Sequence, residues 1–231
     1  MFQRTQEPDA KALLKDNEEL KRKLNLRTRE GWDAMEKEIN DRGKHLGGCW
    51  LPATTGSFHP RLIEWLVTWF NVRSVCDVGC GGGEALKHFR ALGCQVVGIE
   101  GLNYAAVRTG VPTICHDMET GPIKLYGIDC MYSIEYLEHC ANTDSSLDTL
   151  CQSKIIACST AQVGQSGHNH VSLYPREWWI ERIEKRGYIH QPKLTEIAVG
   201  YAGGYFGQNG YIFVKNTAMD EYGLERCDYE T

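Results

Sequence analysis

Alternating strand-like and helix-like segments constrain the fold of this chain more than any other feature of its sequence. Short apolar segments rich in β-branched residues predict buried strands, and they cover residues 72–78, 94–100, 112–116, 127–133 and 153–160. Helical material lies between them, and this alternation predicts a mostly parallel sheet with helices on both faces. Two later strand-like segments, 189–200 and 210–216, have no expected helix between them. They therefore predict an antiparallel hairpin at the end of the sheet.

A glycine-rich turn, CDVGCGGGEALKHF at residues 76–89, separates the first predicted strand from a helix. Glycines allow a ligand to approach the backbone closely, so this arrangement predicts a binding site. A Walker loop is excluded because no Gly-Lys-Ser/Thr closes the turn, and the dinucleotide pattern lacks its third glycine, which is replaced by Glu84. Asp77 at the strand end, with no basic residue nearby, suits a ligand that carries a cationic amine.

This turn resembles motif I of class I S-adenosylmethionine (SAM) methyltransferases, and the resemblance extends over about residues 58–216. It implies an α/β, Rossmann-like fold with a mostly parallel seven-stranded sheet, a C-terminal antiparallel hairpin, and SAM as the cofactor. By position, Glu100 is the acid that binds the ribose hydroxyls. Asp117 would accept from the adenine amino group, with Met118 against the ring, although an aspartate here also suits a turn. The cofactor contacts implied in full are Asp77, Gly79, Cys80, Gly81, Glu100, Gly101, Asp117, Met118 and Ser133.

The fourth predicted strand leads into MYSIEYLEHC, residues 131–140. If a helix starts here, Glu135, Glu138 and His139 share one face, because residues three and four apart are neighbours on a helix. Two acids and a histidine suit a divalent cation, and this E-x-x-E-H resembles metal-dependent O-methyltransferases, including small-RNA 2′-O-methyltransferases and those of ubiquinone synthesis. In those enzymes a histidine after the fifth strand completes the site, and His168 and His170 are the candidates here.

Two chemical interpretations follow for this segment. In the first, Glu135, Glu138, His139 and His170 bind magnesium, manganese or zinc, which lowers the pKa of an acceptor hydroxyl. In the second, no metal binds, and His139, His168 or His170 acts as a general base that loses activity on protonation near pH 6.5.

Residues 1–48 differ in composition from the rest of the chain, with 11 Lys or Arg and 10 Asp or Glu. We expect a charged helical extension at 1–48 and a methyltransferase domain at 49–231. Leu13, Asn17, Leu20 and Leu24 follow a heptad-like spacing that predicts either a homodimer seam or a solvated helix. Because every cofactor residue assigned above lies further along the chain, residues 1–45 are expected to be dispensable for SAM binding.

The favoured function is transfer of a methyl group from SAM to a hydroxyl of a small molecule. The alternatives are a metal-dependent RNA 2′-O-methyltransferase and a non-catalytic binding or structural protein. The net charge of −5 argues against a polyanionic partner, although nucleic acid is not excluded. The sequence shows neither a long apolar run nor a signal-peptide core, so no membrane association is expected. Cysteines in strand segments and the absence of C-x-x-C predict a reduced, cytoplasmic protein.

Overall fold

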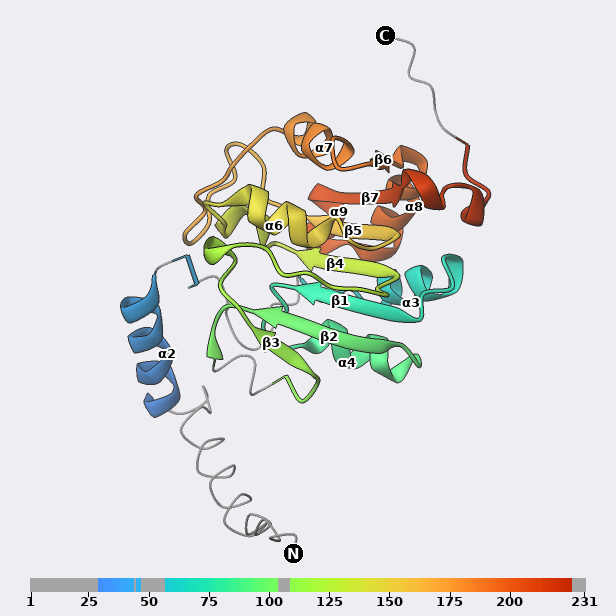
Figure 1. Ribbon diagram of the computed structural model, residues 1–231. Helices are drawn as coiled ribbons and strands as arrows, with labels where there is room; N and C mark the ends of the chain where they lie inside the picture. Colours follow the sequence, from blue (N-terminus) through green and yellow to red (C-terminus); the bar gives the residue numbers. More distant parts are fainter. Residues whose placement is uncertain (1–28, 44, 47–56, 104–108, 226–231) are drawn as a thin grey trace, which may run out of the picture.

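The computed structural model describes residues 29–43, 45–46, 57–103 and 109–225 (Figure 1). The heptad-like stripe from Leu13 to Leu24 lies outside the described residues. The helices are α2 (Arg29–Arg42), α3 (Pro60–Trp69), α4 (Glu84–Ala91), α6 (Thr143–Leu150), α7 (Arg176–Glu184), α8 (Pro192–Ala202) and α9 (Gly204–Asn209). The strands are β1 (Ser74–Val78), β2 (Gln95–Glu100), β3 (Thr113–Cys115), β4 (Cys130–Ile134), β5 (Ile155–Ser159), β6 (Tyr188–His190) and β7 (Gly210–Lys215).

The seven strands form one sheet in the order β3-β2-β1-β4-β5-β7-β6. Strands β1 to β5 pair in parallel, and β7 runs antiparallel to both β5 and β6. The predicted α/β class, the mostly parallel sheet and its five parallel strands are therefore confirmed. The strand order reverses between β1 and β4, and this switch point is where ligands bind in open α/β sheets.

Helices cover both faces of the sheet because successive side chains of each buried strand point to opposite faces. Val75 of β1 packs in a core with α3, α4, α8 and α9, whereas Cys76 packs in a second core with α6 and α7. In β5, Ala157 likewise packs in the first core and Cys158 in the second. Apolar strands without a polar face are typical of parallel sheets that are buried on both sides. Most of the cysteines in the strands are buried and free, as expected.

The C-terminal part of the chain differs from the sequence prediction. Of the expected 189–200 strand, only Ile189 and His190 are extended, as part of β6, and Pro192–Ala202 is the helix α8. Pro192 suits the first turn of a helix, and Leu194 and Ala198, four residues apart, bury one face of α8 in the same core as α3. Strands β6 and β7 are antiparallel as predicted, but two helices connect them, so they are not a hairpin.

Helix α2 packs at the edge of the sheet, beside the ends of β2 and β3 (Figure 1). Met35 of this helix is buried, and Leu46 just beyond it is buried as well. Among the described residues, no helix combines the length and the apolar character that crossing a bilayer requires.

Candidate active site

A cavity of about 650 Å³ lies where β1, β2, β3 and β4 end. The residues predicted from the sequence to bind a cofactor or a metal line this cavity, with one exception, Ser133. They are Asp77, Gly79, Cys80, Gly81, Glu100, Gly101, Asp117, Met118, Glu135, Glu138, His139, His168 and His170. The carboxyl ends of parallel strands thus bring together side chains that lie far apart in the sequence.

The glycine-rich turn has a backbone conformation that residues with a side chain would disfavour. Gly79 has φ 76°, and a Cβ atom there would lie 2.6 Å from Cγ of Tyr136. Gly81 has φ 51°, and its amide donates to Oε2 of Glu100 over 2.9 Å. The amides of Gly79 and Cys80 donate to the Ile99 carbonyl at 2.9 and 3.1 Å. The turn is therefore held against the end of β2, with its peptide groups along the cavity wall.

Two buried carboxyl groups, Asp77 and Glu100, lie beneath this turn, close enough for the charge of Glu100 to act on Asp77. Burial, and to a lesser extent the charge of Glu100, raises the pKa of Asp77 to about 8. Burial also raises the pKa of Glu100, while amide donors such as Leu102 and Gly81 act in the opposite direction. Such a pair favours a ligand that brings positive charge and hydroxyl donors, because both would stabilise the ionised carboxylates.

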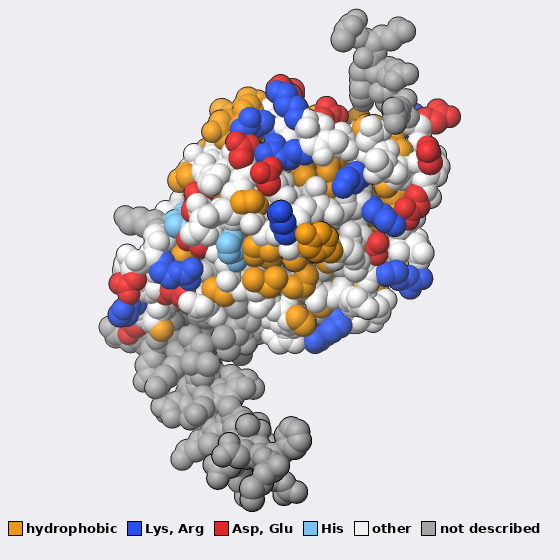
Figure 2. Space-filling view, in the orientation of Figure 1, with side chains coloured by type: hydrophobic (Ala, Val, Ile, Leu, Met, Phe, Trp, Pro, Cys, Tyr) orange, Lys and Arg blue, Asp and Glu red, His pale blue; other side chains and the backbone are white. Residues whose placement is uncertain are grey.

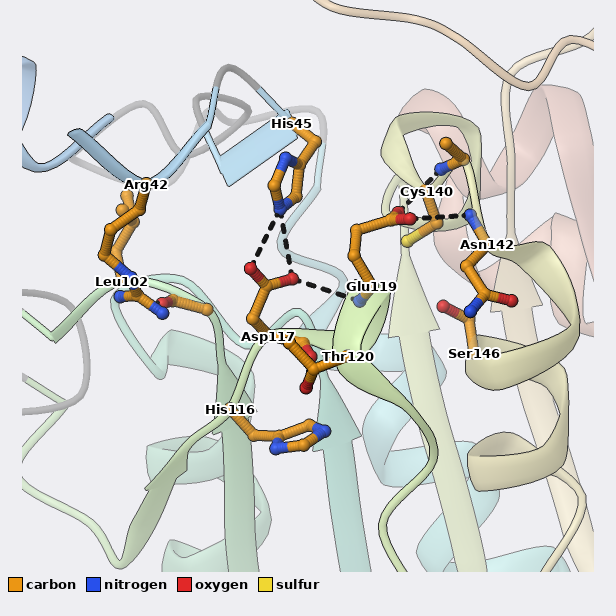
Figure 3. Close-up of polar contacts among 12 residues, drawn as sticks. Arg42, His45, Leu102, His116, Asp117, Glu119, Thr120, Cys140, Asn142 and Ser146 are labelled. Atoms are coloured by element: carbon orange, nitrogen blue, oxygen red, sulfur yellow. Dashed lines mark hydrogen bonds and ion pairs between the residues drawn. The ribbon is translucent and has the colours of Figure 1, made fainter. Parts of the chain in front are cut away.

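Asp117 follows β3 and caps a short 3-10 helix, Met118–Thr120, by accepting from the Glu119 amide over 3.0 Å. Its carboxylate also accepts from Nε2 of His45, which lies 3.0 Å from each of its two oxygens (Figure 3). The turn-forming role expected of an aspartate here is thus present, and the side chain lines the cavity as well. Met118 is buried beside it.

Ser133 does not line the cavity, contrary to its predicted contact with the cofactor. Its side chain is fully buried within β4, and its hydroxyl donates to the Val78 carbonyl of β1 over 2.9 Å. Because side chains alternate along a strand, Ser133 lies on the same buried face of β4 as Met131, which packs in the core with α6 and α7. Ser133 therefore joins the two strands that flank the switch point.

The E-x-x-E-H segment does not form the α-helix on which its predicted shared face depended. Glu135 has φ 53°, and only Leu137–His139 is helical, as a 3-10 turn. The carboxylate of Glu135 accepts from the Ser159 hydroxyl over 2.8 Å instead of joining the other ligands. Among the described residues, the cluster with ligand atoms within 4.8 Å of one another consists of Glu138, His139 and His170.

The segment after β5 packs directly on this 3-10 turn and delivers His170. The Glu138 carbonyl accepts from the amides of Val171 and Ser172 at 2.8 and 3.0 Å. Nε2 of His170 lies 4.0 Å from Oε1 of Glu138, and the His139 and His170 rings are 5.0 Å apart, nearly perpendicular. Of the two histidines left open by the sequence, His170 is the one that joins the cluster.

Burial sets the charges of this cluster. Glu138 is fully buried, and neither of its carboxylate oxygens has a hydrogen-bond partner among the described residues. Burial and the nearby charge of Glu135 raise the pKa of Glu138 to about 8. Burial, followed by the charge of His170, lowers the pKa of His139 to about 4. Burial thus disfavours the charged forms of both Glu138 and His139.

Sequence reasoning missed His45 and Leu46, which line the cavity together with Tyr136. His45 belongs to the segment 1–45 that was expected to be dispensable, and Leu46 directly follows that segment. No local pattern marks them, because their role depends on where α2 packs. The Tyr136 ring lies over Gly79, and its hydroxyl is 3.2 Å from that of Ser146 in α6. The Tyr136 ring leaves no room for a Cβ atom at position 79, so the glycine there is the one sequence signal that relates to Tyr136.

Comparisons with known proteins agree with this fold. A family model described as a methyltransferase domain matches residues 55–196. No curated protein matches the chain. The sugar N-methyltransferase KedS8 from a Streptoalloteichus species superposes with a TM-score of 0.54 at 13% identity, covering 78% of this chain and 92% of that one.

Two further solved structures are similar at this level. The plantazolicin methyltransferase BpumL, solved with S-adenosylhomocysteine (SAH), has a TM-score of 0.52 at 14% identity, covering 87% of this chain and 99% of that one. The magnesium protoporphyrin IX methyltransferase from Synechocystis, also with bound SAH, has a TM-score of 0.51 at 15% identity, covering 67% and 80%. At such identities the likeness concerns the fold, while the family match covers more than half of the chain. The chain therefore belongs to the methyltransferase domain family of class I SAM-dependent enzymes.

Proposed function

We propose that this protein transfers the methyl group of SAM to a hydroxyl group of a small molecule. The observation that carries the proposal is the Glu138–His139–His170 cluster, which opens onto the same cavity as the glycine-rich turn. A methyltransferase has to hold an acceptor in line with the donated methyl group and to accommodate the proton that the acceptor loses. The two sets of residues on one cavity divide these tasks between them.

The glycine-rich turn and three acids hold the cofactor in this proposal. Asp77 supplies negative charge for the cationic amine, and Glu100 accepts from the ribose hydroxyls. Asp117 accepts from the adenine amino group, with Met118 packed against the ring. The sulfonium of SAM is an activated methyl donor, so the protein needs to orient it rather than to form a covalent bond. The buried, mutually repelling carboxyls support this assignment because the cofactor offers them positive charge and donors.

A divalent cation fits the cluster of Glu138, His139 and His170. Glu138 offers two buried oxygens without partners. Nδ1 of His139 lies 3.3 Å from the Asn169 carbonyl, and Nδ1 of His170 lies 3.3 Å from the Gln165 carbonyl. A ring that donates from Nδ1 to a carbonyl keeps Nε2 as its lone-pair atom, and metal-bound histidines are oriented in this way. One carboxylate with two imidazoles favours manganese or zinc over magnesium.

A bound cation would lower the pKa of an acceptor hydroxyl that coordinates to it. The remaining contributions come from the chain itself. The low pKa of His139 keeps its ring neutral at pH 7, so it is available as a ligand. The same low pKa makes His139 a poor general base, since a base is most effective with a pKa near the working pH. This argues for His139 as a metal ligand rather than as the base of the metal-free interpretation, for which His168 and His170 remain the other candidates.

A small acceptor is favoured over nucleic acid by the size of the cavity and by the surface charge. The volume of about 650 Å³ falls within the roughly 300–1,000 Å³ typical of small-molecule sites. On the face shown in Figure 2, the basic side chains of the described residues are interspersed with acidic ones. Proteins that bind nucleic acid instead concentrate Lys and Arg to neutralise phosphates.

Methyl transfer from radiolabelled SAM to a panel of acceptors tests the proposal. The panel contains catechols, phenols, sugar hydroxyls, primary amines and an RNA oligonucleotide. Each acceptor is assayed in EDTA, and again after magnesium, manganese or zinc is restored. We expect labelling of a hydroxyl acceptor that is lost in EDTA and recovered with manganese or zinc. Full activity in EDTA would contradict the role of the metal. Labelling of amines or RNA alone would contradict a small-molecule hydroxyl as the acceptor.

A further inference from the structure

We propose that the segment from α2 to Leu46 forms one wall of the cofactor site and that His45 is a positioning residue for Asp117. The inference rests on the cofactor site proposed above and adds a region that carries none of its assigned residues. Docking of this segment would then be coupled to occupancy of the site by the adenosine part of the cofactor. The segment would be required for full cofactor affinity, contrary to the expectation from sequence.

The contact between His45 and Asp117 is the first observation. Nε2 of His45 lies 3.0 Å from each oxygen of the Asp117 carboxylate, so the ring N–H is shared between the two (Figure 3). The Glu119 amide also donates to Oδ1 of Asp117. These two donors fix the plane of the carboxylate, which still has acceptor capacity because an ionised carboxylate has about four lone-pair sites. Both His45 and Asp117 line the cavity, so the remaining capacity faces the ligand space.

The second observation is that α2 docks on the loop that directly follows Glu100. Nη1 of Arg42 donates to the Gly101 carbonyl over 2.7 Å. The side chain of Glu38 accepts from the backbone amide and from the side-chain amide of Asn103, each at 2.9 Å. The segment therefore contacts Asp117 itself and the loop next to Glu100, two of the three acids assigned to the cofactor. Each contact is polar and directional, which makes the docked position specific.

Glycines provide the space for both side chains that reach the cavity. Gly43 has φ 138°, and a Cβ there would lie 2.5 Å from Cε1 of His45. A Cβ at Gly101 would overlap Cδ2 of Leu46. Gly43 is the residue after α2, and the Leu46 amide donates to its carbonyl over 3.2 Å. The end of the helix is thus shaped to place His45 and Leu46 against the loops after β2 and β3.

Docking of the segment and binding of the ligand are coupled by thermodynamic linkage. A ligand that binds the docked arrangement better than the undocked one stabilises docking, and docking strengthens ligand binding by the same factor. Glu119 extends the contact further, since its carboxylate accepts from the amides of Ala141 and Asn142 at 2.7 and 2.9 Å. Ala141 and Asn142 lie two and three residues after His139 in the chain. The position of His45 is therefore connected through Asp117 and Glu119 to Asn142, shortly after the metal-ligand cluster in the chain (Figure 3).

Calorimetry with SAH on the full chain tests the role of His45, with two matched variants. His45→Phe keeps a planar ring but removes the N–H donor, whereas His45→Gln keeps a donor. We expect His45→Phe to raise the dissociation constant for SAH about tenfold, the usual effect of losing a hydrogen bond to a charged group. His45→Gln should stay within about threefold of the wild type. Equal affinities for all three proteins would overturn the inference.

Glu100→Ala, measured alongside, separates this inference from the cofactor site itself. If Glu100→Ala weakens SAH binding and His45→Phe does not, the site stands and the role of His45 is wrong. If neither variant changes the affinity, the cofactor site is wrongly placed and the inference fails with it.

Limited proteolysis of the wild type provides a measurement that needs no variant. Trypsin can cleave after Arg42 only when its side chain leaves the Gly101 carbonyl, whereas Lys124 lies on an exposed irregular segment. We expect SAH to slow cleavage after Arg42 at least threefold and to leave cleavage after Lys124 nearly unchanged. The same change at both sites, or none at Arg42, would overturn the coupling.

Discussion

The two sides of the cavity are built in different ways. On the cofactor side, the glycine-rich turn, Glu100 and Asp117 lie at the ends of consecutive parallel strands. On the acceptor side, Glu138 and His139 depend on contacts with the segment after β5, which also delivers His170. The first side follows from strand register, and the second from the packing of an irregular segment on a 3-10 turn. Residues at strand ends are thus easier to predict from sequence than residues held by loop packing.

The largest effect should come from the cofactor side, at Gly79. Gly79→Ala places a Cβ 2.6 Å from Cγ of Tyr136 in a backbone with φ 76°. We expect SAH affinity, measured by calorimetry, to fall at least about 100-fold, because the turn and the Tyr136 ring cannot both keep their places. Gly93→Ala is the matched control, since Gly93 has φ 90° and open space around it. Similar affinities for the two variants would show that the shape of the turn does not determine binding.

On the acceptor side, His170 and His168 form a matched pair. Both line the cavity, but only His170 belongs to the three-residue cluster. His170→Ala should weaken manganese or zinc binding by about 100-fold, since even partners outside the ligand set typically contribute about 10–100-fold. His168→Ala should change it little. Metal titration by calorimetry checks this, and equal losses would mean that the packing of the segment does not select the ligand.

Glu100→Ala should weaken SAH binding by about 1.5–3 kcal/mol, the range for hydrogen bonds to a charged group. Glu100 also accepts from the amides of Gly81 and Leu102, so part of the loss reflects a less ordered turn. Glu196→Ala, an exposed position in α8, is the control. Unchanged affinity in the Glu100 variant, with the fold intact by circular dichroism, would contradict the ribose assignment.

The smallest effect concerns the pH dependence of stability without metal. The pKa of His139 is lowered to about 4 in the folded chain, below the value of about 6.5 for an unperturbed histidine. The unfolded chain therefore binds more protons between these values, so stability is present above pH 6.5 and is lost as the pH falls toward 4. From pH 7 to 6 the wild type should lose about 0.7 kcal/mol more than His139→Gln.

Urea unfolding in EDTA at the two pH values measures this difference. The same pH change should have no such effect on activity at saturating metal, because His139 stays neutral. A fall in activity centred near pH 6.5 would indicate a histidine with an ordinary pKa as the base.

Two failures of the sequence-based prediction have a common physical origin. The 189–200 segment contains enough apolar residues to suggest a strand, but Leu194 and Ala198 are four residues apart and bury a helical face. For the E-x-x-E-H segment, the spacing suggested a helix, but the positive φ of Glu135 turns the chain before one can start. In both cases the partner that decides the outcome lies elsewhere in the chain. The α3 core decides the first, and Ser159 of β5 holds Glu135 in the second.

Local sequence was enough to predict the five parallel strands, the helix after the glycine-rich turn, and the strand-end positions of Asp77, Glu100 and Asp117. These features depend on local hydrophobic periodicity and turn chemistry, which are encoded within a few residues. Only the tertiary structure decided that His170 joins Glu138, that Ser133 donates to the neighbouring strand, and that His45 reaches Asp117. Those outcomes depend on contacts between residues 30 or more positions apart. Such contacts form only when the whole sheet and its covering segments pack, and no local pattern encodes them.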